Sequence, residues 1–122
     1  MGVKQAEICW LFVNSRRMAA DNAKYMGHEG STDVITLQYK QVEQKEQLFG
    51  DVIICIDEAI LYAEEYSTTP QSEIIRYLIH SILHLQGYND INPSDRKIMK
   101  RHENKWVKWA EERITSKILQ QT

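Results

Sequence analysis

The sequence predicts one small domain of the α/β (α+β) class, in which a small mixed β-sheet of three to four strands packs against about four helices. The 122 residues, of which 43% are hydrophobic, suit a single core. Short segments rich in β-branched residues alternate with longer segments of helical periodicity. No internal repeat or low-complexity linker divides the sequence, so residues 1–122 are expected to form one domain.

Three segments have the composition of β-strands. Residues 6–13 are nearly continuous in apolar side chains, which predicts a buried strand. Residues 32–39 predict a second strand, and residues 50–56, rich in valine and isoleucine, predict a third. The polar residues 40–48 between them predict an exposed connection.

Two helices are expected in the first half of the chain. Asn14 or Ser15 can cap a helix that ends near Met26, because their short polar side chains accept hydrogen bonds from the first free N–H groups of a helix. Asp57 can cap a second helix, which ends near Tyr66.

Two further helices are expected in the second half. Thr69-Pro70 starts one of them, with proline suited to its first turn. Residues 92–95 start the last helix, which is expected to reach about Leu119. Its spacing predicts an inner stripe formed by Ile98, Met99, His102, Trp106, Ala110 and Ile114.

Charge and cysteine content restrict the class of protein. The net charge of −2 and the pI of about 6.1 provide no overall attraction for nucleic acid, so any RNA contact requires a local basic patch. Cys9 and Cys55 both fall in predicted buried strands, and are expected to be reduced packing residues of a cytoplasmic protein. The apolar residues 8–13 lack the flanking features of a signal peptide.

One short segment has the spacing of a metal site. His80 and His84 are four residues apart, so a helix places both imidazoles on one face. Gly87 allows the chain to turn back, so that Asp90 can supply a third ligand. Three protein ligands leave one coordination position open, as in a catalytic zinc site.

Two other interpretations of this segment, packed histidines and a zinc peptidase, are less favoured. A histidine beside an apolar face is often only packed or hydrogen-bonded, but the added Gly87 and Asp90 favour a metal site. The glutamate that zinc peptidases carry directly after the first histidine is Ser81 here. Serine cannot act as their general base, so an ordinary metallopeptidase is disfavoured.

Several blocks of the chain resemble the YbeY-type endoribonucleases, the rRNA maturation factors. Residues 80–90, HSILHLQGYND, resemble the family signature H-G-x-L-H-L-x-G-Y-D-H. Residues 32–37, TDVITL, resemble its T-D-V-L-S-F strand, and residues 48–55, LFGDVIIC, resemble its L-G-D-I-V-I strand. The remaining matching positions are Asn22, Tyr25, Met99 and Glu103.

The resemblance implies a zincin-like fold and one zinc ion per chain, held by His80, His84 and Asp90. It also implies a single-strand-specific endoribonuclease active in rRNA maturation and ribosome quality control. The expected partners are single-stranded RNA, rRNA and a ribosomal subunit. No association with a membrane is expected.

The chain departs from the family pattern at three places. Asp90 replaces the third histidine, which lowers the charge of the metal centre by one. Met26 stands where the family usually has an arginine, and His28 is the nearest cationic substitute when it is protonated. The family usually begins with an additional strand and helix, so this chain is expected to be a short form.

The catalytic base is not identified by the sequence. Asp33 and Asp51 lie at the ends of the matching blocks and are candidates, but either carboxylate can instead brace a loop.

A basic face on the last helix is the expected RNA contact. Lys97, Arg101, Lys105 and Lys108 share one face by helical spacing. A solvated surface is the alternative reading of such a run of charge, and the family resemblance favours RNA.

Two rival functions remain open from the sequence. One is a zinc hydrolase with a peptide or small-molecule substrate, supported by the zincin spacing. The other is a non-catalytic ribosome-associated RNA-binding protein, which Met26 in place of arginine favours.

Overall fold

A computed structural model describes residues 2–39 and 47–121, with side chains up to residue 114. The elements follow in the order β1 (Gln5–Val13), α1 (Ser15–Asp21), the π-helical turn η1 (Asn22–Met26), β2 (Val34–Gln38), β3 (Gln47–Cys55), α2 (Ile56–Tyr66), α3 (Pro70–Leu85) and α4 (Pro93–Gln121). Most of the predicted connection 40–48 lies outside the described residues. Its last two residues belong to β3, which begins earlier than expected.

The strands form a mixed sheet in the order β1-β3-β2. β1 runs parallel to β3, with Val13 beside Cys55, and β2 runs antiparallel to β3, with Val34 beside Ile54. The three-stranded mixed sheet and the helices that pack on it confirm the predicted class, an α+β fold with a mixed sheet.

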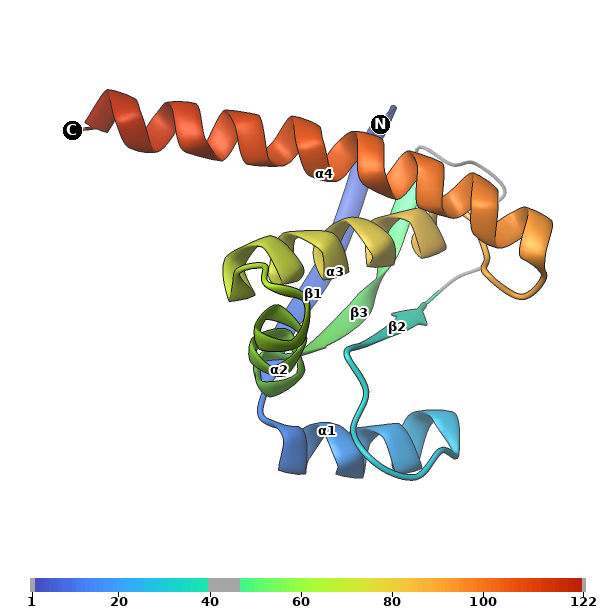
Figure 1. Cartoon of the computed structure of the whole chain (residues 1–122). Coiled ribbons are helices and arrows are strands. Elements are labelled where there is room, and N and C mark those ends of the chain that lie inside the picture. Colours follow the sequence, from blue (N-terminus) through green and yellow to red (C-terminus); the bar gives the residue numbers. More distant parts are fainter. Residues whose placement is uncertain (1, 40–46, 122) are drawn as a thin grey trace.

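Successive residues of β3 point to opposite faces of the sheet, and each face is covered by a helix. Leu48, Val52 and Ile54 pack against Tyr77 and Leu85 of α3. On the opposite face, a second cluster contains Ile53 and Cys55 of β3 and Met18 of α1. Figure 1 shows α3 crossing one face of the sheet, with α1 at the far end of the molecule. The central strand therefore supplies both cores.

α4 forms an outer layer on the side of α3 that faces away from the sheet (Figure 1). Ile79 and Leu83 of α3 pack there against Met99 and Val107 of α4. The buried residues of α4 are spaced by four, and the one between these two is Glu103. The prediction was wrong for two members of the inner stripe, Ile98 and Ile114, which are exposed. The contact between α4 and α3 is narrow and leaves them at the surface.

β1 is an edge strand and is less buried than its composition predicts. Leu11 and Phe12 are 43% and 47% exposed, and Cys9 is also exposed. The expectation of a buried Cys9 was therefore wrong, since β1 has a strand on one side only among the described residues. Cys55, on the central strand, is fully buried as predicted.

Side-chain caps explain where the helices begin. Asn14 accepts a hydrogen bond from the backbone N–H of Arg17, and Thr69 accepts one from Ser72, as predicted. Asp57 does not cap its own helix, which starts one residue earlier. Its carboxylate instead accepts the N–H of Ser15 at 2.7 Å, which ties the start of α1 to α2.

One glycine of the central strand is required by close packing. A Cβ atom on Gly50 would lie 2.5 Å from the carbonyl oxygen of Leu37 and 3.0 Å from the side chain of Leu85. A larger residue at position 50 would therefore require the neighbouring backbone to shift. In the described part of the chain, no helix has the length and apolar character needed to cross a membrane.

Candidate metal centre

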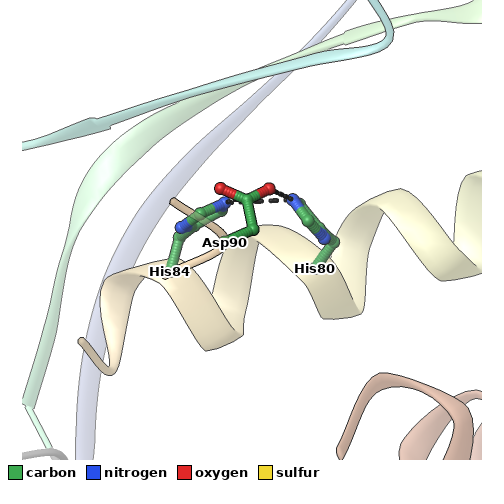
Figure 2. A group of neighbouring side chains, drawn as sticks. All are labelled: His80, His84 and Asp90. Atoms are coloured by element: carbon green, nitrogen blue, oxygen red, sulfur yellow. Dashed lines mark hydrogen bonds and ion pairs between the residues drawn. The ribbon is translucent and has the colours of Figure 1, made fainter. Parts of the chain in front are cut away.

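The end of α3 places the three predicted ligands on one side of the helix. The N–H of Gly87 bonds to the carbonyl of His84, and the N–H of Tyr88 bonds to the carbonyl of Leu83, which is the Schellman pattern of helix termination. Gly87 has a φ of +99°, a conformation that side chains rarely adopt. The chain therefore turns back along α3 and carries Asp90 over the two histidines (Figure 2).

The three side chains converge on one point. The Nε2 atoms of His80 and His84 are 3.0 Å apart. An Asp90 Oδ2 oxygen lies 3.9 Å from the Nε2 of His80 and 4.0 Å from that of His84. Ligands at about 2.0–2.2 Å from a tetrahedral zinc ion stand about 3.3–3.6 Å from one another, so small shifts would complete such a site.

Hydrogen bonds determine which imidazole nitrogens face the common point. The Nδ1 of His80 lies 2.9 Å from a carboxylate oxygen of Glu103, and the Nδ1 of His84 lies 3.1 Å from the carbonyl oxygen of Tyr88. Both partners are acceptors, so each Nδ1 carries the proton. Two Nε2 lone pairs then face each other at 3.0 Å, an arrangement that repels unless a proton or a metal ion lies between them. The donor set therefore fits a metal ion.

Glu103 supports His80 from behind. It is 5% exposed and also accepts hydrogen bonds from Arg76 at 2.6 Å and Lys100 at 3.3 Å. Burial by itself raises the pKa of Glu103, but the hydrogen bonds from His80 and Arg76 outweigh burial and hold this pKa at about 2. Glu103 is therefore ionised at neutral pH and orients the His80 ring. In the sequence, Glu103 matches the family pattern, but its spacing from the other motifs predicts no role for it.

The environment of His84 also favours a neutral ligand. Burial lowers the pKa of His84, and the neighbouring His80 lowers it further, while Asp90 acts in the opposite direction. A neutral imidazole is the form that binds a metal ion.

Two cavities meet at this cluster. The first, which we call the α4 cavity, has a volume of about 540 Å³ and is lined by His80, Asp90 and residues of α3 and α4. The second, the β2 cavity, has a volume of about 490 Å³ and is lined by all three predicted ligands and by residues of η1 and β2. The cluster is therefore accessible from two sides.

The two candidate carboxylates have different positions. Asp33 lines both cavities, together with His80 and Asp90. One of its oxygens also accepts the N–H of Val34 at 2.7 Å, so Asp33 does brace its loop as expected. Asp51 belongs to the set of β3 residues that point away from α3, and it accepts a hydrogen bond from the Tyr39 hydroxyl. The structure therefore brings Asp33 to the cluster, and does not bring Asp51 there.

The predicted basic face of α4 is only partly at the cluster. Lys97 lines the α4 cavity, whereas Arg101, Lys105 and Lys108 are exposed residues outside its lining. The other cations of the lining are Arg76, Arg96 and Lys100. Helical spacing alone could not predict these three cations as cavity residues, because it does not show which side of α4 faces α3.

The structure also places four other residues that the sequence pattern singled out: Met26, His28, Asn22 and Ser81. Met26 and His28 are exposed at the β2 cavity, where the family's arginine would stand. Asn22 is buried and donates a hydrogen bond to the carbonyl of Gly30 at 2.9 Å. Ser81 is fully buried and donates a hydrogen bond to the carbonyl of Leu78 in its own helix at 2.7 Å.

Comparison with known proteins identifies the family. A family model described as endoribonuclease YbeY matches residues 2–111. The chain belongs to this family. An endoribonuclease YbeY of Bacteroides thetaiotaomicron is 36% identical over 104 residues, which cover 85% of this chain and 74% of the relative. One of Parabacteroides distasonis is 35% identical over 104 residues, covering 85% and 71%.

The family and the class of enzyme predicted from the sequence are both confirmed by these YbeY matches, since the relatives are named endoribonucleases. A solution structure of a Thermotoga maritima protein is similar in fold, with a TM-score of 0.67. It is 23% identical, and the match covers 93% of this chain and 75% of that one. At this identity it supports the fold alone.

Proposed function

We propose that this protein is a zinc-dependent endoribonuclease that cuts single-stranded RNA during rRNA maturation and ribosome quality control in the cytoplasm. The observation that carries the proposal is the convergence of His80, His84 and Asp90 in a chain of the YbeY family. rRNA, as part of a ribosomal subunit, is the proposed physiological partner.

The donor set supports zinc as the metal. Two imidazole nitrogens and one carboxylate oxygen are common ligands of catalytic zinc, and they leave one position open. A bound zinc ion would supply Lewis acidity toward a phosphoryl oxygen or a water molecule. Asp90 makes the site one charge less positive than three histidines would, which weakens its attraction for phosphate.

The surrounding residues have separate tasks in this proposal. Glu103 and the carbonyl of Tyr88 hold the two imidazoles in the tautomer that presents Nε2. Asp33 is the proposed proton acceptor for an attacking water, and its place in the lining of both cavities, together with His80, supports this role. Ser81 is buried and bonded to Leu78, so it cannot replace the glutamate of a zinc peptidase.

The proposal is tested with purified protein and a labelled single-stranded RNA. We expect the wild-type protein to cut the RNA, chelation to stop cleavage, and added zinc to restore it. A His80→Ala, His84→Ala variant should be inactive under all three conditions. Equal cleavage by this variant and the wild type would refute the mechanism, as would a zinc-loaded wild type that binds RNA without cutting it. The latter result would favour the non-catalytic binding protein.

A further inference from the structure

The two cavities beside the cluster differ in charge. The α4 cavity is lined by four cationic side chains, Arg76, Arg96, Lys97 and Lys100, and by four carboxylates, Asp33, Glu73, Asp90 and Glu103, so its formal charges balance. The β2 cavity is lined by Asp33 and Asp90 with no such compensation. The lining of the β2 cavity contains neither lysine nor arginine, and the family's arginine position in it is Met26. A strand of RNA that reaches the cluster carries one negative charge per nucleotide, so the two sides cannot serve its backbone equally.

Two of the four cations are engaged within the protein. Arg76 and Lys100 both bond to Glu103, at 2.6 Å and 3.3 Å. Among the residues whose side chains the structure describes, Arg96 and Lys97 are in no hydrogen bond or ion pair through their side chains, and both are exposed. Their charges are therefore available to a ligand.

The start of α4 positions these two residues relative to the metal centre. The Asn92 side chain accepts the N–H of Asp95 at 2.9 Å and donates to the Asp95 carboxylate at 2.7 Å, which fixes the first turn of the helix. Asn92 follows Asp90 by two residues, so the helix that presents Arg96 and Lys97 begins directly after the third ligand.

One aromatic residue of the cavity suits a nucleotide base. Tyr62 and Tyr77 both contribute to the lining, but Tyr77 is buried in the core, whereas Tyr62 is 43% exposed. Exposed aromatic rings beside cations are the usual surface on which single-stranded nucleic acids stack their bases and bind their phosphates.

We infer that the α4 cavity holds the RNA phosphates next to the reacting one, through Arg96 and Lys97. The inference rests on the proposed function and names the part of the site that binds the substrate. Of the face predicted from sequence, it retains Lys97, whereas Arg101, Lys105 and Lys108 are assigned no contact. Arginine suits a phosphate because its guanidinium group can donate two parallel hydrogen bonds.

The test compares two variants that remove the same charge from the same helix. Arg96→Gln, Lys97→Gln changes the cavity, and Arg101→Gln, Lys108→Gln changes the outer face. Binding of a labelled single-stranded RNA is followed by fluorescence anisotropy at several salt concentrations, with the length of the RNA checked on a gel. Circular dichroism verifies that both variants are folded.

We expect the cavity variant to raise Kd about 100-fold, because it loses two charge-assisted hydrogen bonds, each worth about tenfold. For the cavity variant, the slope of log K against the logarithm of the salt concentration should be less steep by about 1.4. Each of the two lost phosphate contacts to a single strand contributes about 0.7 to this slope. The control variant should keep the salt dependence of the wild type and a Kd within about twofold of it.

Equal effects of the two variants, or a larger effect of the control, would overturn the inference. Failure of the nuclease proposal is distinguishable. If the wild type binds RNA through the cavity but does not cut it, only the nuclease function fails. If it cuts RNA and the cavity variant binds as tightly as the control, only the inference fails. A wild type that neither binds nor cuts RNA refutes both.

Discussion

At the scale of single residues, the candidate metal centre depends on a side chain that is not one of the three candidate ligands. Glu103 bonds to His80, Arg76 and Lys100, so one buried carboxylate connects α3 to α4 and orients an imidazole. A hydrogen-bonded carboxylate behind a metal-binding histidine fixes the tautomer and makes the ring a better donor. His84 has the weaker partner of the two histidines, the neutral carbonyl of Tyr88.

Replacing Glu103 should weaken metal binding without removing a ligand. We expect Glu103→Gln to lower zinc affinity by about 10–100-fold, since the amide is a poorer acceptor for the Nδ1 proton of His80. Zinc affinity is measured by competition with a chromophoric chelator. Glu112→Gln, at an exposed position of the same helix, should leave it unchanged. A Glu103 variant with wild-type affinity would contradict the orienting role.

At the scale of elements, the end of α3 is the decisive feature. The helix supplies two ligands four residues apart, and its Schellman termination returns the chain so that the third ligand reaches them. The same turn leads directly into α4, which therefore packs with its first turns beside the centre. A change in this turn should thus alter the metal site more than its modest cost in folding free energy suggests.

The positive φ of Gly87 provides the test. Gly87→Ala should reduce the free energy of unfolding by about 1–2 kcal/mol and should also weaken zinc binding, because Asp90 is displaced. Gly30→Ala is a matched control, since Gly30 has a φ of +84° and open space around its Cβ position. We expect similar destabilisation in denaturant titrations for both variants, with zinc affinity lowered for Gly87→Ala only. Equal zinc affinities would show that this turn does not position Asp90.

At the scale of the whole molecule, the protein is built in layers around β3, with α1 on one face, α3 on the other and α4 outside α3 (Figure 1). The candidate ligands lie on α3 and on the loop between α3 and α4. A metal ion bound there would hold the loop against the helix in the folded state only, so binding should stabilise the fold.

Removal of the metal should therefore lower the melting temperature. A ligand at about 100 times its Kd stabilises the folded state by about 2.7 kcal/mol, which corresponds to roughly 10 °C for a chain of this length. Thermal unfolding followed by circular dichroism, with zinc and then with chelator, checks this shift. The His80→Ala, His84→Ala variant should melt at the same temperature in both conditions. The same shift in that variant would place the stabilising ion elsewhere.

Features that depend on short spacing could be predicted from the amino-acid sequence alone: the strand and helix order, the helix starts at Asn14 and Thr69, the glycine turn, and the proposed ligands His80, His84 and Asp90. Local backbone geometry decides these, and it is encoded within a few residues. The family resemblance rested on the same kind of short motif, and the comparisons confirm it.

Which residues share a surface depends on how the elements pack, and this could not be predicted from short spacing. In the sequence, Asp33 and Asp51 are equally good candidates for the catalytic base. Because side chains alternate between the two faces along β3, Asp51 points away from α3, whereas Asp33 lines both cavities. Helical spacing predicts that Lys97, Arg101, Lys105 and Lys108 share one face of α4, but packing against α3 leaves Arg96, Lys97 and Lys100 in the cavity lining. Likewise, β1 reads as a core strand and lies at the sheet edge. The physical reason is that periodicity specifies directions around one element, whereas burial and proximity depend on which other element packs there.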